Sequence, residues 1–273
     1  MIDQRCCIIL PTNSKYIDVC KNFVDLLKRN WPDCPYPLVV SVTGEDKKVK
    51  GTENLYNGTD ATLINCVVNA SETYNYDYYM IFLGDSFMCA TVDTQKVKDL
   101  INDMLINELD YCCLYPEKSR MKIKKVGKQM RLTHIRDRYC HCFGYLLCNK
   151  KYIREMFIES GITTDIQYEI WYLKKTLESD TNYYYMHDAA LINNIFNIKR
   201  GIKKGKWDRG VYRLMKKQYP DIQLAIRPRL SILEQMIMSI RNKTIYIIPD
   251  KLRIYIKKTI SKLMKRNPFD TMT

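Results

Sequence analysis

Short, continuous apolar runs alternate along the chain with segments in which apolar residues recur every three or four positions. The continuous runs are shorter than typical helices and predict strands that are buried on both faces. They comprise Cys6–Leu10, Leu38–Val42, Tyr78–Leu83, Tyr111–Tyr115, Phe143–Cys148 and Tyr183–Met186. The recurring pattern predicts helices over Lys15–Asn30 and Asp60–Tyr74 and from Thr94 onward. Strands that alternate with helices predict an α/β protein.

The most informative stretch runs from Tyr78 to Pro116 and predicts a strand, an acidic turn, a helix and a second strand. The turn is Gly84-Asp85-Ser86, so Asp85 follows the carboxyl end of the first of these strands. Ligands of α/β sheets bind beyond such carboxyl ends. Aspartate is also common in turns that bind nothing, so position alone leaves both interpretations of Asp85 open.

Three segments of this stretch resemble bacterial glycosyltransferases of the GT-A fold, in particular those that assemble capsular or lipopolysaccharide glycans. They are Gly84-Asp85-Ser86-Phe87, Val92-Asp93-Thr94 and Asp110-Tyr111-Cys112-Cys113-Leu114-Tyr115-Pro116, and their order and spacing match that family. The resemblance implies a GT-A-like (Rossmann-like) domain over residues 1–226, in which helices flank a mixed sheet. The chain departs from the family at Gly84, where an aspartate is usual.

The resemblance also implies donor-binding residues. In the family, the loop after the first strand contacts the nucleotide, which here points to Pro11, Thr12 and Asn13, although these residues equally suit an ordinary strand-to-helix turn. The family often carries a Gly-Lys-Trp run, and Asn197–Trp207 is similar to it. Two glycines among several cations predict a flexible loop that closes over a diphosphate. We expect donor contacts from Asp85, Lys204, Lys206 and Trp207.

Catalytic and metal-binding candidates follow from the same resemblance. Asp165 and Glu169 are four residues apart at the start of a predicted helix, so they share one face, and a carboxylate there can act as the base of an inverting transferase. Glu169 is favoured, and the alternative is a capping aspartate beside an exposed glutamate. Asp85 is expected to bind Mg²⁺ or Mn²⁺ with His187 as a second ligand, or His187 is structural. Gly84 lacks a carboxylate, which predicts weak or absent metal dependence.

The charge of the chain is concentrated at its C-terminal end. The formal net charge is +14, and residues 199–273 contain 20 Lys and Arg but only 5 Asp and Glu. Within residues 227–273, the segment Lys251–Arg266 predicts a basic amphipathic helix, the pattern of an anchor on an anionic membrane surface. A helix packed on the core with a solvated basic face is the alternative. No nucleic-acid-binding motif accompanies these cations, so no nucleic-acid partner is expected.

The cysteines and apolar runs indicate the compartment. Most of the 11 cysteines lie inside apolar runs, no CxxC pair occurs, and no secretory signal precedes the first predicted strand. No apolar stretch reaches the roughly 20 residues of a transmembrane helix. These features predict a cytoplasmic protein in a reducing environment, peripheral on the inner face of the plasma membrane.

Together these features and the resemblance predict an enzyme that transfers a sugar from a nucleotide-sugar donor to a lipid-linked glycan acceptor during surface polysaccharide synthesis. A non-catalytic, glycosyltransferase-like binding protein is the first alternative, because Gly84 removes a carboxylate from the expected site. A basic nucleic-acid-binding protein is the second.

Overall fold

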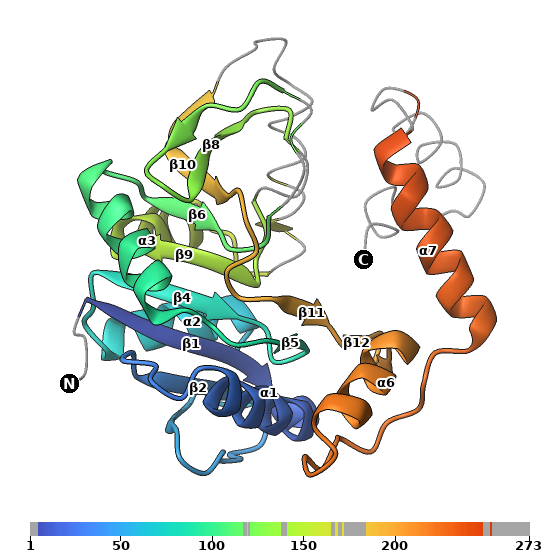
Figure 1. Ribbon diagram of the computed structural model, residues 1–273. Coiled ribbons are helices and arrows are strands. Elements are labelled where there is room, and N and C mark those ends of the chain that lie inside the picture. The colour runs from blue at the N-terminus through green and yellow to red at the C-terminus, as the bar shows by residue number, and fades with distance from the viewer. Residues whose placement is uncertain are drawn as a thin grey trace.

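The computed structural model describes residues 5–116, 119, 121–137, 141–164, 167–168, 171, 184–247 and 252. A nine-stranded mixed sheet with the order β3-β2-β1-β4-β9-β6-β10-β8-β7 forms its centre (Figure 1). The strands are β1 (Cys6–Asn13), β2 (Leu38–Thr43), β3 (Glu53–Tyr56), β4 (Tyr78–Phe82), β6 (Tyr111–Cys113), β7 (Lys125–Val126), β8 (Met130–His134), β9 (Tyr145–Asn149) and β10 (Tyr184–Leu191).

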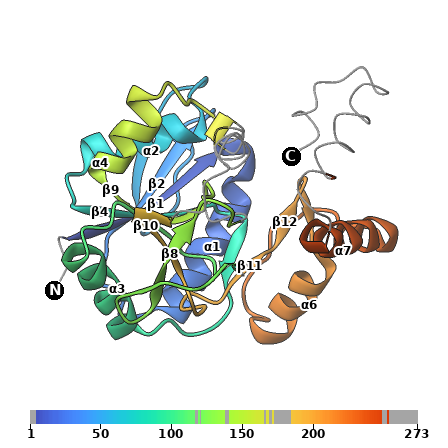
Figure 2. The same cartoon turned by 90° about the horizontal axis from the view of Figure 1, so that it is seen from above.

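Helices cover both faces of this sheet, as Figure 2 shows from above. α1 (Ile17–Asn30) and α3 (Thr94–Ile106) pack on one face, where Phe23 of α1 meets Phe82 of β4. α2 (Leu63–Thr73) and α4 (Lys150–Ile153), which continues into the π-helical turn η2 (Arg154–Glu159), pack on the other face. The predicted α/β architecture, a mixed sheet flanked by helices, is therefore confirmed.

The stretch 78–116 forms the predicted strand, helix and strand, but the two strands are not neighbours. β9 lies between them and pairs antiparallel with both, so that Cys148 faces Tyr79 on one side and Tyr111 on the other. β4 nevertheless runs parallel to β1 and β2, so the carboxyl ends of these three strands lie at one edge of the sheet. We call this edge the carboxyl edge.

Strand pairing and side-chain caps set the ends of several elements, and the end of β1 differs from the prediction. β1 runs on to Asn13 instead of stopping at Leu10, because its pairing with β2 continues to Asn13 after its pairing with β4 has ended at Ile9. The Asn13 side chain then caps the short 3₁₀ turn η1 (Ser14–Tyr16) before α1. Thr62 caps α2, since it forms a reciprocal capping box with Asn65. Asp93 caps α3, with its side chain accepting from Gln95 N and Lys96 N.

The C-terminal part begins with short strands beside the carboxyl edge. β5 (Ser86–Met88) pairs antiparallel with β11 (Ile198–Arg200), and β12 (Ile202–Lys203) forms a hairpin with β13 (Lys206–Trp207). α6 (Arg209–Gln218) and α7 (Ile232–Ile247) follow. In Figure 1, α7 extends away from the sheet.

Gln223–Ile226 does not form the strand that its apolar residues predict. Its backbone is bonded to side chains instead: Gln223 O accepts from Asn22 Nδ2 at 2.7 Å, Ala225 N donates to Asn22 Oδ1 at 2.8 Å, and Ala225 O accepts from Trp207 Nε1 at 2.9 Å. These side-chain bonds satisfy the backbone groups that a strand would pair.

The predicted boundary between residues 226 and 227 falls inside a packed segment. Arg227 forms a two-pronged ion pair with Asp18 of α1, with distances of 3.0 and 2.7 Å. Pro228 O and Leu230 N bond to the backbone of Trp207, and the Leu230 side chain is only 2% exposed. The predicted basic helix Lys251–Arg266 lies outside the described residues except for Leu252, which is helical and exposed.

Candidate functional site

Asp85 lies at the carboxyl edge, in the turn between β4 and β5. Its carboxylate keeps a defined orientation. Oδ1 accepts a hydrogen bond from Ser86 Oγ at 3.0 Å, and Oδ2 lies 3.7 Å from Arg200 Nε at the end of β11. The Asp85 side chain is 23% exposed and that of Arg200 is 61% exposed. A carboxylate and a guanidinium are thus both accessible at the end of a central strand.

Tyr145, the first residue of β9, extends this arrangement. Its hydroxyl is hydrogen-bonded to Ser86 Oγ. Since the single proton of Ser86 Oγ is donated to Asp85, Tyr145 is the donor in that bond. The hydroxyls of Tyr145 and Ser86 therefore form a relay that ends on Asp85 and fixes its carboxylate.

Burial shifts the pKa values of the two titratable groups in this relay, Asp85 and Tyr145. Burial raises the pKa of Asp85 above its ordinary value, although Arg200 and the hydrogen bond from Ser86 oppose that shift. Burial, and then the nearby charge of Asp85, raise the pKa of Tyr145. Tyr145 consequently stays neutral and able to donate near neutral pH, while the charged form of Asp85 is held at an electrostatic cost.

Gly84 is placed where a side chain has little room. A Cβ built on Gly84 would lie 3.3 Å from Cys20 Cα and 3.5 Å from Cys20 Cβ, on helix α1. Such a contact is tight, and its main partner is backbone, which cannot rotate away. The close approach of this turn to α1 therefore favours glycine over a residue with a carboxylate at position 84.

The hairpin β12–β13 starts beside Asp85. Gly201 N and Ile202 N donate to Asp85 O at 2.8 and 3.3 Å. A Cβ on Gly201 would lie 2.2 Å from the Phe87 ring and 3.2 Å from the Trp207 ring, so this glycine permits the close packing of β5 against the hairpin. The hairpin is thereby fixed to the Asp85 turn by backbone bonds and packing.

The tip of the hairpin is a two-residue turn that carries a cation. Lys204 and Gly205 have φ values of +51° and +73°, the signs of a type I′ turn. The tip lies near the end of β1, because a Cβ on Gly205 would be 3.7 Å from Tyr16 Oη and 4.0 Å from Arg227 Nη1. The Arg227 guanidinium lies over the Tyr16 ring at 4.5 Å. The hairpin therefore spans from Asp85 to the loop after β1.

The predicted donor-binding residues divide into accessible and buried ones. Lys204 is exposed, and Asn13 is half-buried at the end of β1. Pro11 and Thr12 are buried inside β1, because the strand is longer than predicted. Trp207, in strand β13, is fully buried, stacks on Phe87 and donates to Ala225 O. In this conformation its ring packs inside the protein and does not face a ligand. Lys206 forms an ion pair with Glu234 at 2.7 Å.

His187 lies at the opposite edge of the sheet from Asp85. In β10, the residue after it, Asp188, faces Tyr111 at the start of β6, and His187 Nδ1 lies 3.0 Å from Glu108 O. This corrects the prediction that His187 and Asp85 bind one metal ion. The predicted bases Asp165 and Glu169 lie outside the described residues.

The described residues do not fit a preformed metal site. No group of three or more His, Cys, Asp and Glu side chains among them could hold an ion. Mg²⁺ needs several oxygen ligands, whereas Asp85 supplies one carboxylate, Gly84 supplies none, and the cationic Arg200 lies nearby. Phosphate oxygens of a bound ligand would have to complete the coordination.

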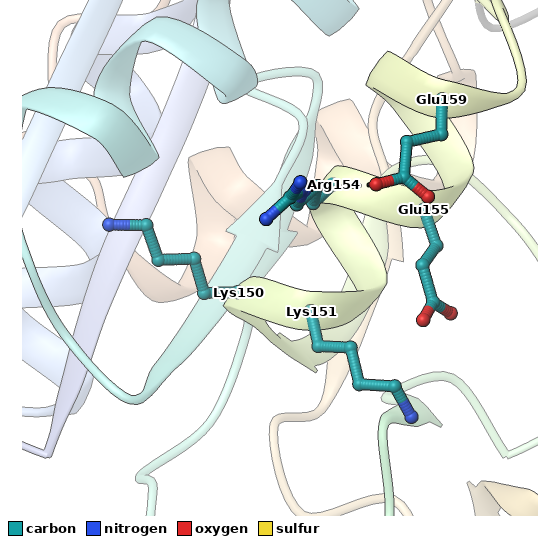
Figure 3. Close-up of a pocket in the computed structure, with 5 residues that line it drawn as sticks. All are labelled: Lys150, Lys151, Arg154, Glu155 and Glu159. Carbon is teal, nitrogen blue, oxygen red and sulfur yellow. Dashed lines mark hydrogen bonds and ion pairs between the residues drawn. The ribbon is translucent and has the colours of Figure 1, made fainter.

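A surface depression of about 350 Å³ lies far from this chemistry. It is lined by Lys150, Lys151, Arg154, Glu155 and Glu159 of α4 and η2 (Figure 3). α4 begins at the carboxyl end of β9, which faces the start of β4, so the depression is at the other edge of the sheet from Asp85. Its charges partly pair with one another, as Arg154 does with Glu159 at 2.9 Å.

Two functional candidates were not found by sequence reasoning. Tyr145 lies inside the predicted strand Phe143–Cys148, but nothing in its neighbourhood signals that β9 is inserted next to β4. Arg200 stands directly before a glycine in a cationic run, which was a usable signal, but its contact with Asp85 depends on the pairing of Arg200 with Ser86 across β11 and β5. Both contacts are non-local.

No protein-family model matches the chain, and no curated protein matches it in sequence. Among solved structures, S. aureus TarS has 9% identity and a TM-score of 0.46, over 80% of this chain and 40% of TarS. The inositol-1-phosphate CTP transferase of T. maritima has 12% identity and a TM-score of 0.41, over 82% of this chain and 100% of that one. A cytidylyltransferase of Leptospira borgpetersenii has 14% identity and a TM-score of 0.41, over 64% and 73%. These likenesses concern the course of the backbone and assign no substrate to this chain.

Proposed function

We propose that the chain is a nucleotide-sugar-dependent glycosyltransferase whose donor site lies at the carboxyl edge around Asp85. One observation supports this most: an oriented carboxylate, an accessible guanidinium and a glycine-containing cationic hairpin meet at the end of central strand β4. This is the place where ligands of open α/β sheets bind. The combination suits a ligand that carries both hydroxyls and a diphosphate.

Each group has a role that its chemistry allows. Arg200 and Lys204 would offset negative charge on the diphosphate, and this help is greatest as the nucleoside diphosphate departs. Asp85, oriented by Ser86 and Tyr145, would accept hydrogen bonds from hydroxyls of the ribose or the sugar. Asn13 and the exposed ring of Tyr16 lie where the nucleoside would extend along the edge.

A divalent cation has a limited place in this proposal. Mg²⁺ or Mn²⁺ bound together with the phosphates would add to charge neutralisation when present. Because Asp85 is one carboxylate beside Arg200, we expect no binding of the metal without donor and a weak metal dependence of activity.

The proposed activation of the acceptor depends on residues that were predicted from the sequence. Glu169, or Asp165, would remove the proton from the attacking acceptor hydroxyl in an inverting reaction. The acceptor would be a glycan, carried on a lipid in surface polysaccharide synthesis, which agrees with a peripheral position on the inner face of the plasma membrane. Among the described residues, no helix is long and apolar enough to cross a membrane.

The test is release of nucleoside diphosphate from UDP-, GDP- and dTDP-sugars, and of CMP from CMP-sugars, with added glycan acceptors. We expect release with one nucleotide class and its loss in Asp85→Asn and Arg200→Gln. Lys125→Asn on edge strand β7 is the matched control, since it removes an exposed lysine far from the site. Pyrophosphate release from a nucleoside triphosphate, with no sugar transfer, would contradict the proposal in favour of a nucleotidyltransferase.

A non-catalytic glycan- or nucleotide-binding protein is the second candidate. The tight surroundings of Gly84 at Cys20 favour it, because this turn then carries one aspartate where the resembling family usually has two. Saturable donor binding that is lost in Asp85→Asn, without turnover under any metal or acceptor condition, would select this candidate.

A further inference from the structure

Helix α7 is attached to the rest of the molecule through its polar side. Glu234 pairs with Lys206 Nζ at 2.7 Å, and Gln235 Nε2 donates to Asp208 Oδ2 at 2.7 Å. Glu234 also closes a capping box with Ser231, which starts the helix. The first turn of α7 is therefore held against the hairpin β12–β13 and the start of α6.

The large apolar residues of α7 lie away from this attachment and are exposed. Their exposed fractions are between 56% and 66%, and they are Ile232, Leu233, Met236, Ile237 and Ile240. At 3.6 residues per turn these five share one side of the helix, and Glu234 and Gln235 lie outside it. A surface helix normally shows the opposite arrangement, with its apolar side inward. We call these five residues the apolar stripe.

The net charge of the sequence segment that contains the apolar stripe indicates what covers it. Residues 227–273 contain 11 Lys and Arg but only 3 Asp and Glu, and Arg229 is exposed just before α7. A second copy of the chain would bring the same positive charge into contact with itself. An anionic lipid surface attracts each nearby cation and also takes up apolar side chains.

We infer that the apolar stripe of α7 inserts into the interfacial region of an anionic lipid bilayer. The contacts of Glu234 and Gln235 then connect the lipid-bound helix to the hairpin beside Asp85, so the hairpin is held close to the membrane surface. This inference deepens the peripheral membrane position that is part of the proposed function and rests on it, but it is tested separately, because lipid binding is measured without donor or turnover.

The experiment is co-sedimentation of the full chain with vesicles of phosphatidylcholine alone or with about 30% phosphatidylglycerol, at low and high salt. The variant is Ile232→Gln/Ile237→Gln, in the apolar stripe. The matched control is Ile106→Gln/Ile123→Gln, which changes two exposed isoleucines outside α7. Circular dichroism and thermal unfolding check that both variants fold, as expected for exposed positions.

We expect binding to phosphatidylglycerol vesicles that is weakened roughly tenfold or more in the stripe variant and unchanged in the control variant, since buried isoleucine drives insertion. Equal binding by wild type and the stripe variant would overturn the inference. A wild-type dimer in light scattering that the stripe variant abolishes, without vesicle binding, would also overturn it and assign the stripe to a second copy.

Discussion

Gly84 and Asp85 are neighbours that the structure constrains in different ways. A Cβ on Gly84 would lie 3.3 Å from the backbone of α1 at Cys20, which makes any side chain there tight, whereas Asp85 has an accessible carboxylate. Asp85 is also held by Ser86 of β5 and by Arg200 of β11, and Ser86 is in turn hydrogen-bonded to Tyr145 of β9, so the position of Asp85 does not depend on its own turn alone. At the scale of single residues, the site is therefore built around one carboxylate.

Restoring the family's aspartate at residue 84 should not create a metal site. We expect Gly84→Asp to lower the free energy of unfolding by about 1–3 kcal/mol, because its Cβ would overpack against Cys20 Cα. Urea denaturation measures the loss, and titration with Mn²⁺ in the absence of donor should show no gain in binding. Unchanged stability together with new Mn²⁺ binding would contradict the account of Gly84.

Asp85→Asn should stabilise the free protein in a pH-dependent way. Burial raises the folded-state pKa of Asp85 above the ordinary 3.8, so the charged form is disfavoured by folding. That penalty is absent below the ordinary pKa and appears as the pH rises through the folded-state pKa. The stability gap between Asp85→Asn and wild type should thus grow from about pH 3 to about pH 7 in urea denaturation. A gap that shrinks over this range would show that Arg200 and Ser86 outweigh burial.

At the scale of elements, the hairpin β12–β13 combines a strained turn with a cation. Lys204 adopts a positive φ that asparagine and glycine tolerate better, and its side chain is exposed. No hydrogen-bond or ion-pair partner of Lys204 Nζ occurs among the described residues, unlike the paired Lys203 and Lys206. A strained backbone that presents an unpaired cation is typical of a binding loop.

Lys204→Asn should separate the effect of the backbone strain at the hairpin tip from the effect of its positive charge. We expect it to stabilise the protein by up to about 1 kcal/mol, because Asn-Gly is a preferred type I′ turn, and to weaken donor binding through the lost charge. Lys204→Ala is the matched variant, since it removes the same charge and keeps the strain. Thermal unfolding and donor titration measure both effects, and unaltered donor affinity in both variants would remove the hairpin tip from the site.

The sequence predicted the positions of the strands along the chain better than it predicted which strands pair with one another. Continuous apolar runs identified β2, β4 and β6, because strands buried on both faces need apolar residues at every position. The insertion of β9 between β4 and β6 is a non-local pairing that leaves no local pattern. The placement of His187 depends on a related point: β10 continues through buried Ala189–Leu191, so His187 lies in the middle of a longer strand and not at its carboxyl end.

At the scale of the whole molecule, the segment after residue 226 is part of the domain before it becomes α7. Arg227, Pro228 and Leu230 contact α1 and the hairpin, so the C-terminal extension is connected directly to the candidate site. All ten cysteines that the structure describes are free thiols. Attachment of the extension therefore relies on packing and hydrogen bonds.

Leu230→Ala should reveal this attachment. We expect it to lower the free energy of unfolding by about 2–5 kcal/mol, because Leu230 is 2% exposed and its removal leaves a cavity beside Trp207. Leu233→Ala, at a position that is 66% exposed, should change it by less than about 0.5 kcal/mol. Urea denaturation compares the two, and equal effects would place the start of the extension outside the packed domain.

The most direct test of the central claim is donor-induced thermal stabilisation of wild type, Asp85→Asn and Lys204→Asn, with UDP-, GDP-, CMP- and dTDP-sugars and with or without Mn²⁺. We expect one nucleotide class to stabilise wild type by about 2.7 kcal/mol at 100 times its dissociation constant. The shift should be lost in Asp85→Asn, reduced in Lys204→Asn and only weakly dependent on Mn²⁺. No shift with any donor, or an equal shift in all three proteins, would contradict a donor site at the carboxyl edge.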